Sequence, residues 1–121
     1  MGATSVIPAV ADAGPLIHLA EINALHFLAL FVPLLVPEQV WDETVGHGRV
    51  VAHDLHAVSG LRRVTVSDDT CDRFVAANDL HHLHVGERAC LTLCARDRLN
   101  TLLTDDLAVR DAAKQLGVQP V

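Results

Sequence analysis

Aromatic side chains are scarce in this sequence of 121 residues, which contains no Tyr, three Phe and one Trp. Half of the residues are nonetheless hydrophobic and only 20% are charged, a balance that excludes an intrinsically disordered chain. The core must therefore be built from Val, Leu, Ile and Ala, which suits a parallel sheet covered by helices on both faces. The length predicts one domain that spans residues 1–121.

Cysteines are also few, and Cys71, Cys90 and Cys94 form an odd set without a C-x-x-C pair. This spacing argues against a disulfide framework and favours a reducing cytoplasm. The most apolar stretch, residues 24–36, is shorter than the roughly 20 residues that span a bilayer. The N-terminus lacks the basic segment of a secretion signal. We therefore expect a soluble cytoplasmic protein with no membrane partner.

Positive charge is in deficit, because nine Lys and Arg stand against fifteen Asp and Glu and give a net charge of −6. Such a balance disfavours nucleic-acid binding, since phosphates repel an acidic surface. The balance changes locally if several carboxylates hold a metal cation. The positions of the acidic residues therefore matter more than the total charge.

The order of apolar runs and turn residues predicts strands that alternate with helices. Strands are expected at residues 5–11, 32–36, 61–66, 101–104 and 118–121. Helices are expected at residues 15–22, 23–31, 37–45, 50–58, 67–77, 86–98 and 107–116. This alternation predicts an α/β fold with a central, mainly parallel sheet of four or five strands and right-handed crossovers.

Aspartates stand at the ends of two of these strands. Asp12 ends the first, and the pair Asp105-Asp106 follows the strand before the last long helix. Each could simply cap the helix that follows it. Because ligands bind outside the carboxyl ends of parallel strands, the two acidic strand ends together favour a functional site, with no basic partner evident beside them.

Glu87 is a third candidate. It stands three and four residues before Cys90 and Leu91, so it continues the apolar stripe of its helix. A carboxylate on an inward stripe is costly unless it is paired or holds a metal. The alternative is that it overhangs the core and favours the positive helix end. Glu38, Asp42 and Glu43 lie off the apolar face of their own helix, where each reads as a solvated charge.

Crowded carboxylates repel one another, and a cation would neutralise them. Oxygen ligands favour Mg²⁺ or Mn²⁺ over Zn²⁺. Such a cluster suits the hydrolysis of a phosphodiester bond. Among the basic side chains, Arg88 and Arg110 could bind a phosphate. His53 and His56 have the spacing of half a zinc site, but they fit solvated side chains better.

The sequence resembles the PIN-domain family of metal-dependent ribonucleases, in the compact prokaryotic branch near VapC-type toxins. The likeness spans nearly the whole chain and rests on the order and spacing of four blocks, residues 10–17, 36–43, 85–89 and 103–110. It implies a three-layer α/β/α sandwich, Mg²⁺ or Mn²⁺ as cofactor, and RNA as substrate. For toxin members it further implies an antitoxin partner and a homodimer.

Carried over by position, the likeness places the family's acids on Asp12, Glu43 and Glu87 and, through a Thr-x-Asp pattern, on Asp106. It implies that Thr104 supplies a supporting hydroxyl. It implies catalytic roles for Asp12, Glu43, Glu87 and Asp106. The metal ligands would be Asp12, Glu87, Asp105 and Asp106.

The sequence departs from the family pattern at Ala13, where relatives often carry Ser or Thr after the first Asp, and many relatives continue past the position of Val121. The missing hydroxyl motivates an alternative, a catalytically weak PIN-like module that binds RNA or a protein partner. A third class, an aspartate-based phosphatase or receiver, fits less well. A phosphatase would need an acid at Gly14, and the lysine of a receiver would stand at a strand end, unlike Lys114.

Overall fold

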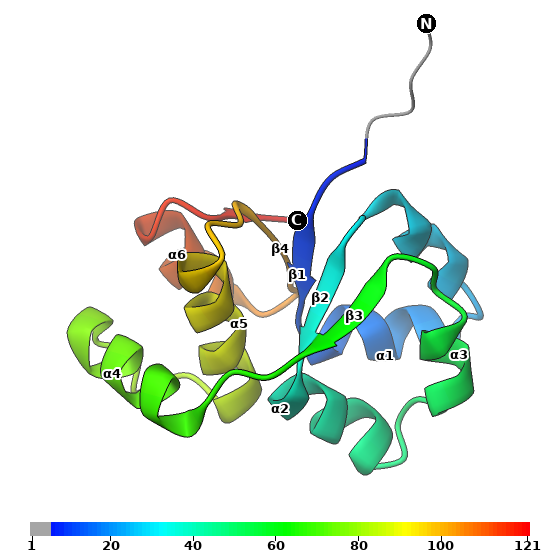
Figure 1. Cartoon of the computed structure of the whole chain (residues 1–121), viewed down its shortest axis with the longest axis horizontal. Helices are drawn as coiled ribbons and strands as arrows, with labels where there is room; N and C mark the ends of the chain where they lie inside the picture. Colours follow the sequence, from blue (N-terminus) through cyan, green and yellow to red (C-terminus); the bar gives the residue numbers. More distant parts are fainter. Residues whose placement is uncertain (1–5) are drawn as a thin grey trace, which may run out of the picture.

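Five parallel strands form the centre of the molecule, in a computed structural model that describes residues 6–121 (Figure 1). The strands are β1 (Ala9–Ala11), β2 (Leu34–Pro37), β3 (Leu61–Val64), β4 (Thr101–Leu103) and β5 (Gln119–Pro120). Their spatial order is β3-β2-β1-β4-β5, and every pairing is parallel. The chain starts at the central strand β1, adds β2 and β3 on one side of it, and then crosses to the other side for β4 and β5. Strands that are distant in sequence, such as β1 and β4, therefore become neighbours.

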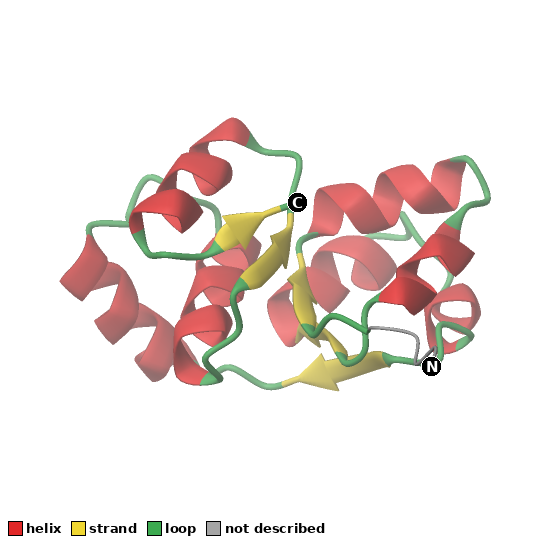
Figure 2. Cartoon of the chain, turned by 90° about the horizontal axis from the view of Figure 1, so that it is seen from above, coloured by secondary structure: helices red, strands yellow, loops and turns green. Residues whose placement is uncertain are grey.

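Helices cover both faces of this sheet (Figures 1 and 2). One layer contains α1 (Ala13–Glu21), the 3₁₀ helix η1 (Leu25–Leu30) and α3 (Ala52–His56). The other contains α4 (Asp68–Asn78), α5 (Val85–Arg96) and α6 (Leu107–Gln115). Between the layers, α2 (Glu38–Trp41) and the π turn η2 (Asp42–Gly46) continue from β2 and contact α5 and α1. The predicted three-layer α/β/α sandwich is confirmed.

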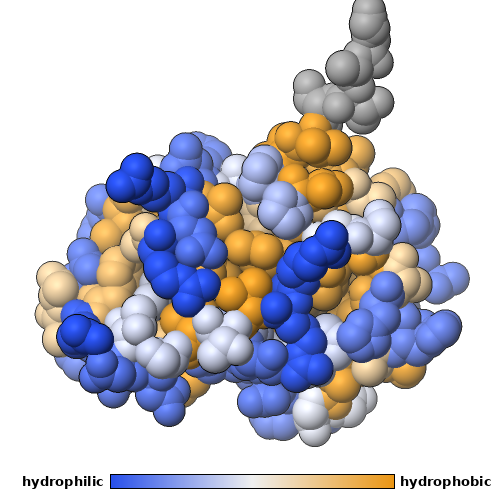
Figure 3. All heavy atoms as spheres, viewed as in Figure 1, coloured by the Kyte–Doolittle hydropathy of each residue, from blue (hydrophilic) through white to orange (hydrophobic). Residues whose placement is uncertain are grey.

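The core is aliphatic, as the composition predicts. All three residues of β1 are fully buried, and α5 crosses β1, β2 and β4 with most of its length inaccessible. Cys71, Cys90 and Cys94 are buried free thiols, and burial raises the pKa of Cys94 to about 12. Figure 3 shows apolar residues in the middle of this face, with hydrophilic residues on both sides of them. No helix among residues 6–121 is long and apolar enough to cross a membrane.

Several element boundaries differ from those expected. The first strand begins at Ala9 rather than at residue 5, which lies outside the described residues. The α-helix expected at 23–31 is a 3₁₀ helix that starts at Leu25, because Asn23 has a positive φ of 55° and ends the preceding helix. The helix expected at 37–45 changes into a π turn after Trp41. This last difference matters for the acid at position 43.

Truncating the core should cost much of the folding free energy. Leu102 in β4 is fully buried, so Leu102→Ala should lower the free energy of unfolding by about 2–5 kcal/mol in urea titrations. Leu107 is 77% exposed, and Leu107→Ala should change the free energy of unfolding by less than about 0.5 kcal/mol. Equal losses for the two variants would contradict this difference in burial.

Candidate functional site

The site is built on the carboxyl ends of β1 and β4, which pair with Val10 opposite Leu102 and Ala11 opposite Leu103. Asp12 and Thr104 follow these strands directly and therefore lie side by side. The Thr104 hydroxyl donates a hydrogen bond to Oδ2 of Asp12 at 3.2 Å. Both side chains are buried, although they stand 92 residues apart in the sequence.

Asp12 combines two roles that the sequence could not separate. Its Oδ1 accepts a hydrogen bond from the Ala13 N–H at 2.8 Å, so it caps α1. Burial raises the pKa of the Asp12 carboxyl from 3.8 to about 6, against the lowering effect of the Ala13 N–H and Thr104 hydroxyl. The charges of Glu87 and Glu43 raise this pKa further. Asp12 is therefore a helix cap that is also part of a carboxylate cluster.

Glu87 lies in the first turn of α5, and its side chain is buried. The His84 N–H donates a hydrogen bond to its Oε1 at 2.7 Å, which fixes the carboxylate at the helix N-terminus. Because α5 packs on β1, the Glu87 carboxylate lies near Asp12, and its charge raises the pKa of the Asp12 carboxyl. The inward stripe that the sequence predicted for Glu87 is therefore present.

Glu43 reaches the same cluster from the π turn η2. Its carboxylate accepts a hydrogen bond from the Gly86 N–H, and a Cβ at Gly86 would come within 2.8 Å of its Cδ. Burial raises the pKa of Glu43, and the charge of Glu87 adds to this rise. The Gly86 N–H and the charges of His84 and His47 lower it. The expectation of a solvated charge is wrong for Glu43.

The other two acids of that helix stay outside the cluster. Asp42 is exposed, and Glu38 forms an ion pair with Arg63, with 2.7 Å between Oε2 and Nη2. An α-helical pattern could not choose among the three, because η2 winds more residues into a turn than an α-helix does. Thr44 marks this change: its buried hydroxyl donates to the carbonyls of Val40 and Trp41.

Asp105 and Asp106 lie at the rim of the cluster, and both are exposed. Asp106 caps α6 by accepting a hydrogen bond from the Val109 N–H at 3.1 Å, and its own N–H donates to the Thr104 hydroxyl at 3.3 Å. Asp105 pairs with Nδ1 of His18 at 2.8 Å. His18 is thus the basic partner that sequence reasoning missed, because only the fold brings α1 beside the end of β4.

The arginines predicted to meet phosphate are engaged with the backbone instead. Arg110 donates from Nη1 to the Thr104 carbonyl at 3.1 Å, and Arg88 donates from Nη2 to the His81 carbonyl. Arg110 therefore supports the strand end that carries Thr104. Arg88 ties the loop before α5 to the helix, with its Nε buried and unpaired among the described residues.

The donor set suits a hard divalent cation, because Asp12, Glu43, Glu87 and Thr104 offer only oxygen atoms. Burial raises the pKa values of the Asp12 and Glu43 carboxyls, and the negative charge of neighbouring carboxylates adds to this rise. Within residues 6–121, however, no three His, Cys, Asp or Glu side chains are arranged ready to hold an ion together. Metal binding would therefore require the carboxylates to turn toward one another.

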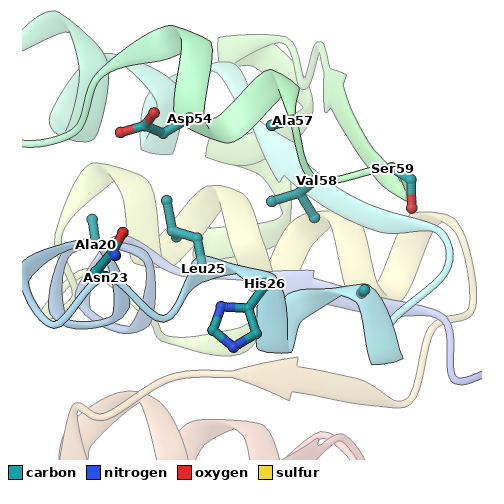
Figure 4. A pocket seen from close by; sticks show the side chains of 9 residues that line it. Ala20, Asn23, Leu25, His26, Asp54, Ala57, Val58 and Ser59 are labelled. Atoms are coloured by element: carbon teal, nitrogen blue, oxygen red, sulfur yellow. The ribbon is translucent and has the colours of Figure 1, made fainter.

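One cavity lies beside this cluster, and another lies apart from it. An apolar groove of about 390 Å³ borders Thr104 and Asp105 and is walled by η1, α1 and the chain end, including Phe27, Leu30 and Val121. A second cavity of about 320 Å³ lies between η1 and α3, with Leu25 and Val58 extending into it (Figure 4). None of the predicted site residues lines this second cavity.

The chain matches a known protein family and resembles solved structures in its fold. A family model described as a PIN domain, DUF3368, matches residues 8–121. Seven chains of known structure match, one of them in a toxin-antitoxin complex from Klebsiella pneumoniae. That chain is 21% identical, with a TM-score of 0.62 over 84% of this chain and 89% of its own length. Among curated proteins none matches.

The raised pKa of Asp12 predicts how stability depends on pH without divalent ions. Because Asp12 titrates at about 6 when folded and near 3.8 when unfolded, the folded chain binds this proton more tightly, and stability falls as pH rises between these values. From pH 3 to pH 7 the free energy of unfolding should fall by about 3 kcal/mol more in the native protein than in Asp12→Asn. Parallel pH profiles from chelator-treated samples would contradict this.

Proposed function

The chain belongs to the PIN-domain family, and on that basis we propose that it is a metal-dependent endoribonuclease that hydrolyses RNA phosphodiester bonds. The observation that carries the proposal is the meeting of Asp12, Glu43 and Glu87, from three separate elements, at the carboxyl edge of the sheet. Burying carboxylates beside one another opposes folding. A cluster of this kind is therefore best explained by chemistry that needs it.

Mg²⁺ or Mn²⁺ is the proposed cofactor, because every donor in the cluster is an oxygen. Asp12 and Glu87 would hold the ion, with Asp106 and Asp105 completing the ligands from the rim. When bound, such an ion activates water and stabilises the oxygen that leaves. Asp106 is exposed and can turn inward only by giving up its cap on the Val109 N–H. Asp105 would have to leave its pair with His18.

The chain's own groups have distinct proposed roles. Thr104 orients Asp12 through the hydrogen bond that its hydroxyl donates, and Arg110 holds the Thr104 backbone by donating to its carbonyl. Glu43 has a raised pKa, which suits a carboxylate that accepts a proton from the attacking water. The Gly86 N–H keeps that carboxylate against the start of α5.

Purified protein should cleave single-stranded RNA with Mg²⁺ or Mn²⁺ and lose the activity with a chelator. Glu43→Gln should lower kcat by about 10² to 10⁴-fold, because it removes a proton acceptor. Asp42→Asn is the matched control, since Asp42 is the exposed neighbour, and it should keep nearly full activity. Gel-based cleavage assays measure both.

Equal activity of Glu43→Gln and the native protein, or cleavage that survives the chelator, would overturn the proposed chemistry. If the native protein cleaves no RNA and binds no metal by calorimetry, the ribonuclease proposal fails. Growth arrest on expression that Asp12→Asn relieves would instead exclude the inactive alternative.

A second prediction isolates the placement of Glu43. Gly86→Ala adds a Cβ that collides with the Glu43 carboxylate and displaces the proposed proton acceptor, so it should lower the rate of RNA cleavage by about 10-fold or more. Gly46→Ala is the control, because its Cβ would meet only Asp42 at an ordinary 3.6 Å. The cleavage assay with Mn²⁺ measures both rates. An unchanged rate in Gly86→Ala would remove Glu43 from the role of proton acceptor.

The alternative function is a catalytically weak PIN-like module that binds RNA or a protein. Ala13 favours it: the residue after the first acid offers only its N–H, which Asp12 already accepts. In that case Asp12→Asn should leave partner binding intact, and metal binding should be weak. The cleavage assay therefore separates the two functions.

An antitoxin is the proposed protein partner. The solved toxin-antitoxin complex from Klebsiella pneumoniae supports it through the shared fold. The apolar groove beside Thr104 and Asp105, with Phe27 59% and Leu30 60% exposed, would offer such a partner a surface next to the carboxylates. The homodimer and the cytoplasmic location stay predictions.

A further inference from the structure

Most cations of this chain are already engaged. Arg63, Arg73 and Arg96 form ion pairs with acidic neighbours. Three more, Arg62, Arg88 and Arg110, donate to backbone carbonyls. Within residues 6–121 the side chains that form neither contact are Arg49, Arg98 and Lys114.

Only one of these three lies at the edge that carries the carboxylates. Both α5 and α6 begin at that edge, with Glu87 and Asp106, and run away from it. Arg98 follows the end of α5, and Lys114 lies in the last turn of α6, so both stand at the opposite edge. Arg49 instead follows η2, which contains Glu43.

The backbone around Arg49 is held firmly. Gly48 turns the chain with a φ of +70°, and the N–H groups of Arg49 and Val50 donate to the Thr44 carbonyl at 2.8 and 3.2 Å. Val50 is 5% exposed and anchors the loop in the core. The Arg49 side chain is exposed between these fixed points. The loop thus presents a cation at a defined place.

His47 connects this loop to the carboxylates. It ends η2 four residues after Glu43, and its charge lowers the pKa of that carboxyl. His47 is therefore close enough to affect the Glu43 carboxyl, and the exposed Arg49 follows it two residues later in the same loop.

We propose that Arg49 and His47 bind a backbone phosphate of the RNA strand next to the carboxylate centre. The proposal rests on the RNA-binding part of the proposed function. A chain of net charge −6 repels RNA, and the carboxylate cluster adds to that repulsion, so a cation beside the cluster is needed to hold the strand. Arg suits this role because its planar guanidinium matches a phosphate with two hydrogen bonds. Phosphate contacts position a strand without reading its bases.

Binding of fluorescein-labelled single-stranded RNA to the full chain tests this, in an Asp12→Asn background that prevents turnover. Arg49→Ala should weaken binding by about 10-fold, similarly for different sequences. The slope of log Kd against log salt should fall by about 0.7 for the lost phosphate contact. His47→Ala should show a smaller loss, and Arg49→Lys should recover part of the affinity. Lys114→Ala, the charge-matched control at the opposite edge, should bind within twofold of the parent.

The inference is overturned if Arg49→Ala binds as tightly as the parent, if Lys114→Ala weakens binding equally, or if the Asp12→Asn chain binds no RNA. Cleavage by the native background, assayed in parallel with Mn²⁺, separates this inference from the proposed function. RNA binding that depends on Arg49 without any cleavage supports the inference and sinks the ribonuclease. Cleavage with binding independent of Arg49 does the reverse.

Discussion

The pairing of β1 with β4 is the constraint on which the site depends. It joins residues near the start of the chain to residues about 90 positions later, and it sets Asp12 against Thr104. Both strands must be parallel for their carboxyl ends to meet at one edge, and the long excursion through β2, β3, α4 and α5 makes this possible. The same excursion returns α5 across β1, which delivers Glu87.

The cluster is held in place against its own electrostatics. Asp12 and Glu43 have raised pKa values because burial and neighbouring negative charge both disfavour their ionised forms. Helix N-termini offset part of this cost, since the N–H groups of Ala13, His84 and Gly86 donate to the three carboxylates. The aliphatic core supplies the remaining stability, so the chain can maintain a cluster that opposes folding.

The segment after β2 shows how one local irregularity serves several purposes. Buried Thr44 returns its hydroxyl to the helix backbone, the helix widens into the π turn, and Glu43 comes to lie against Gly86. The Thr44 carbonyl then accepts the N–H groups that fix the loop carrying Arg49. The placement of a proposed catalytic acid and of a proposed phosphate-binding cation therefore traces to a single turn of the chain.

The sequence by itself determined the α/β alternation, the aliphatic core, the strand ends at Asp12 and Asp106 and the inward stripe of Glu87, because these follow from local periodicity. It could not place Glu43 without the family likeness, since η2 departs from the α-helical period that such reasoning assumes. Nor could it show that His18 pairs with Asp105, or that Arg88 and Arg110 are engaged with carbonyls. Only the tertiary structure decided these contacts, because each joins elements that are remote in sequence or depends on how a loop folds back.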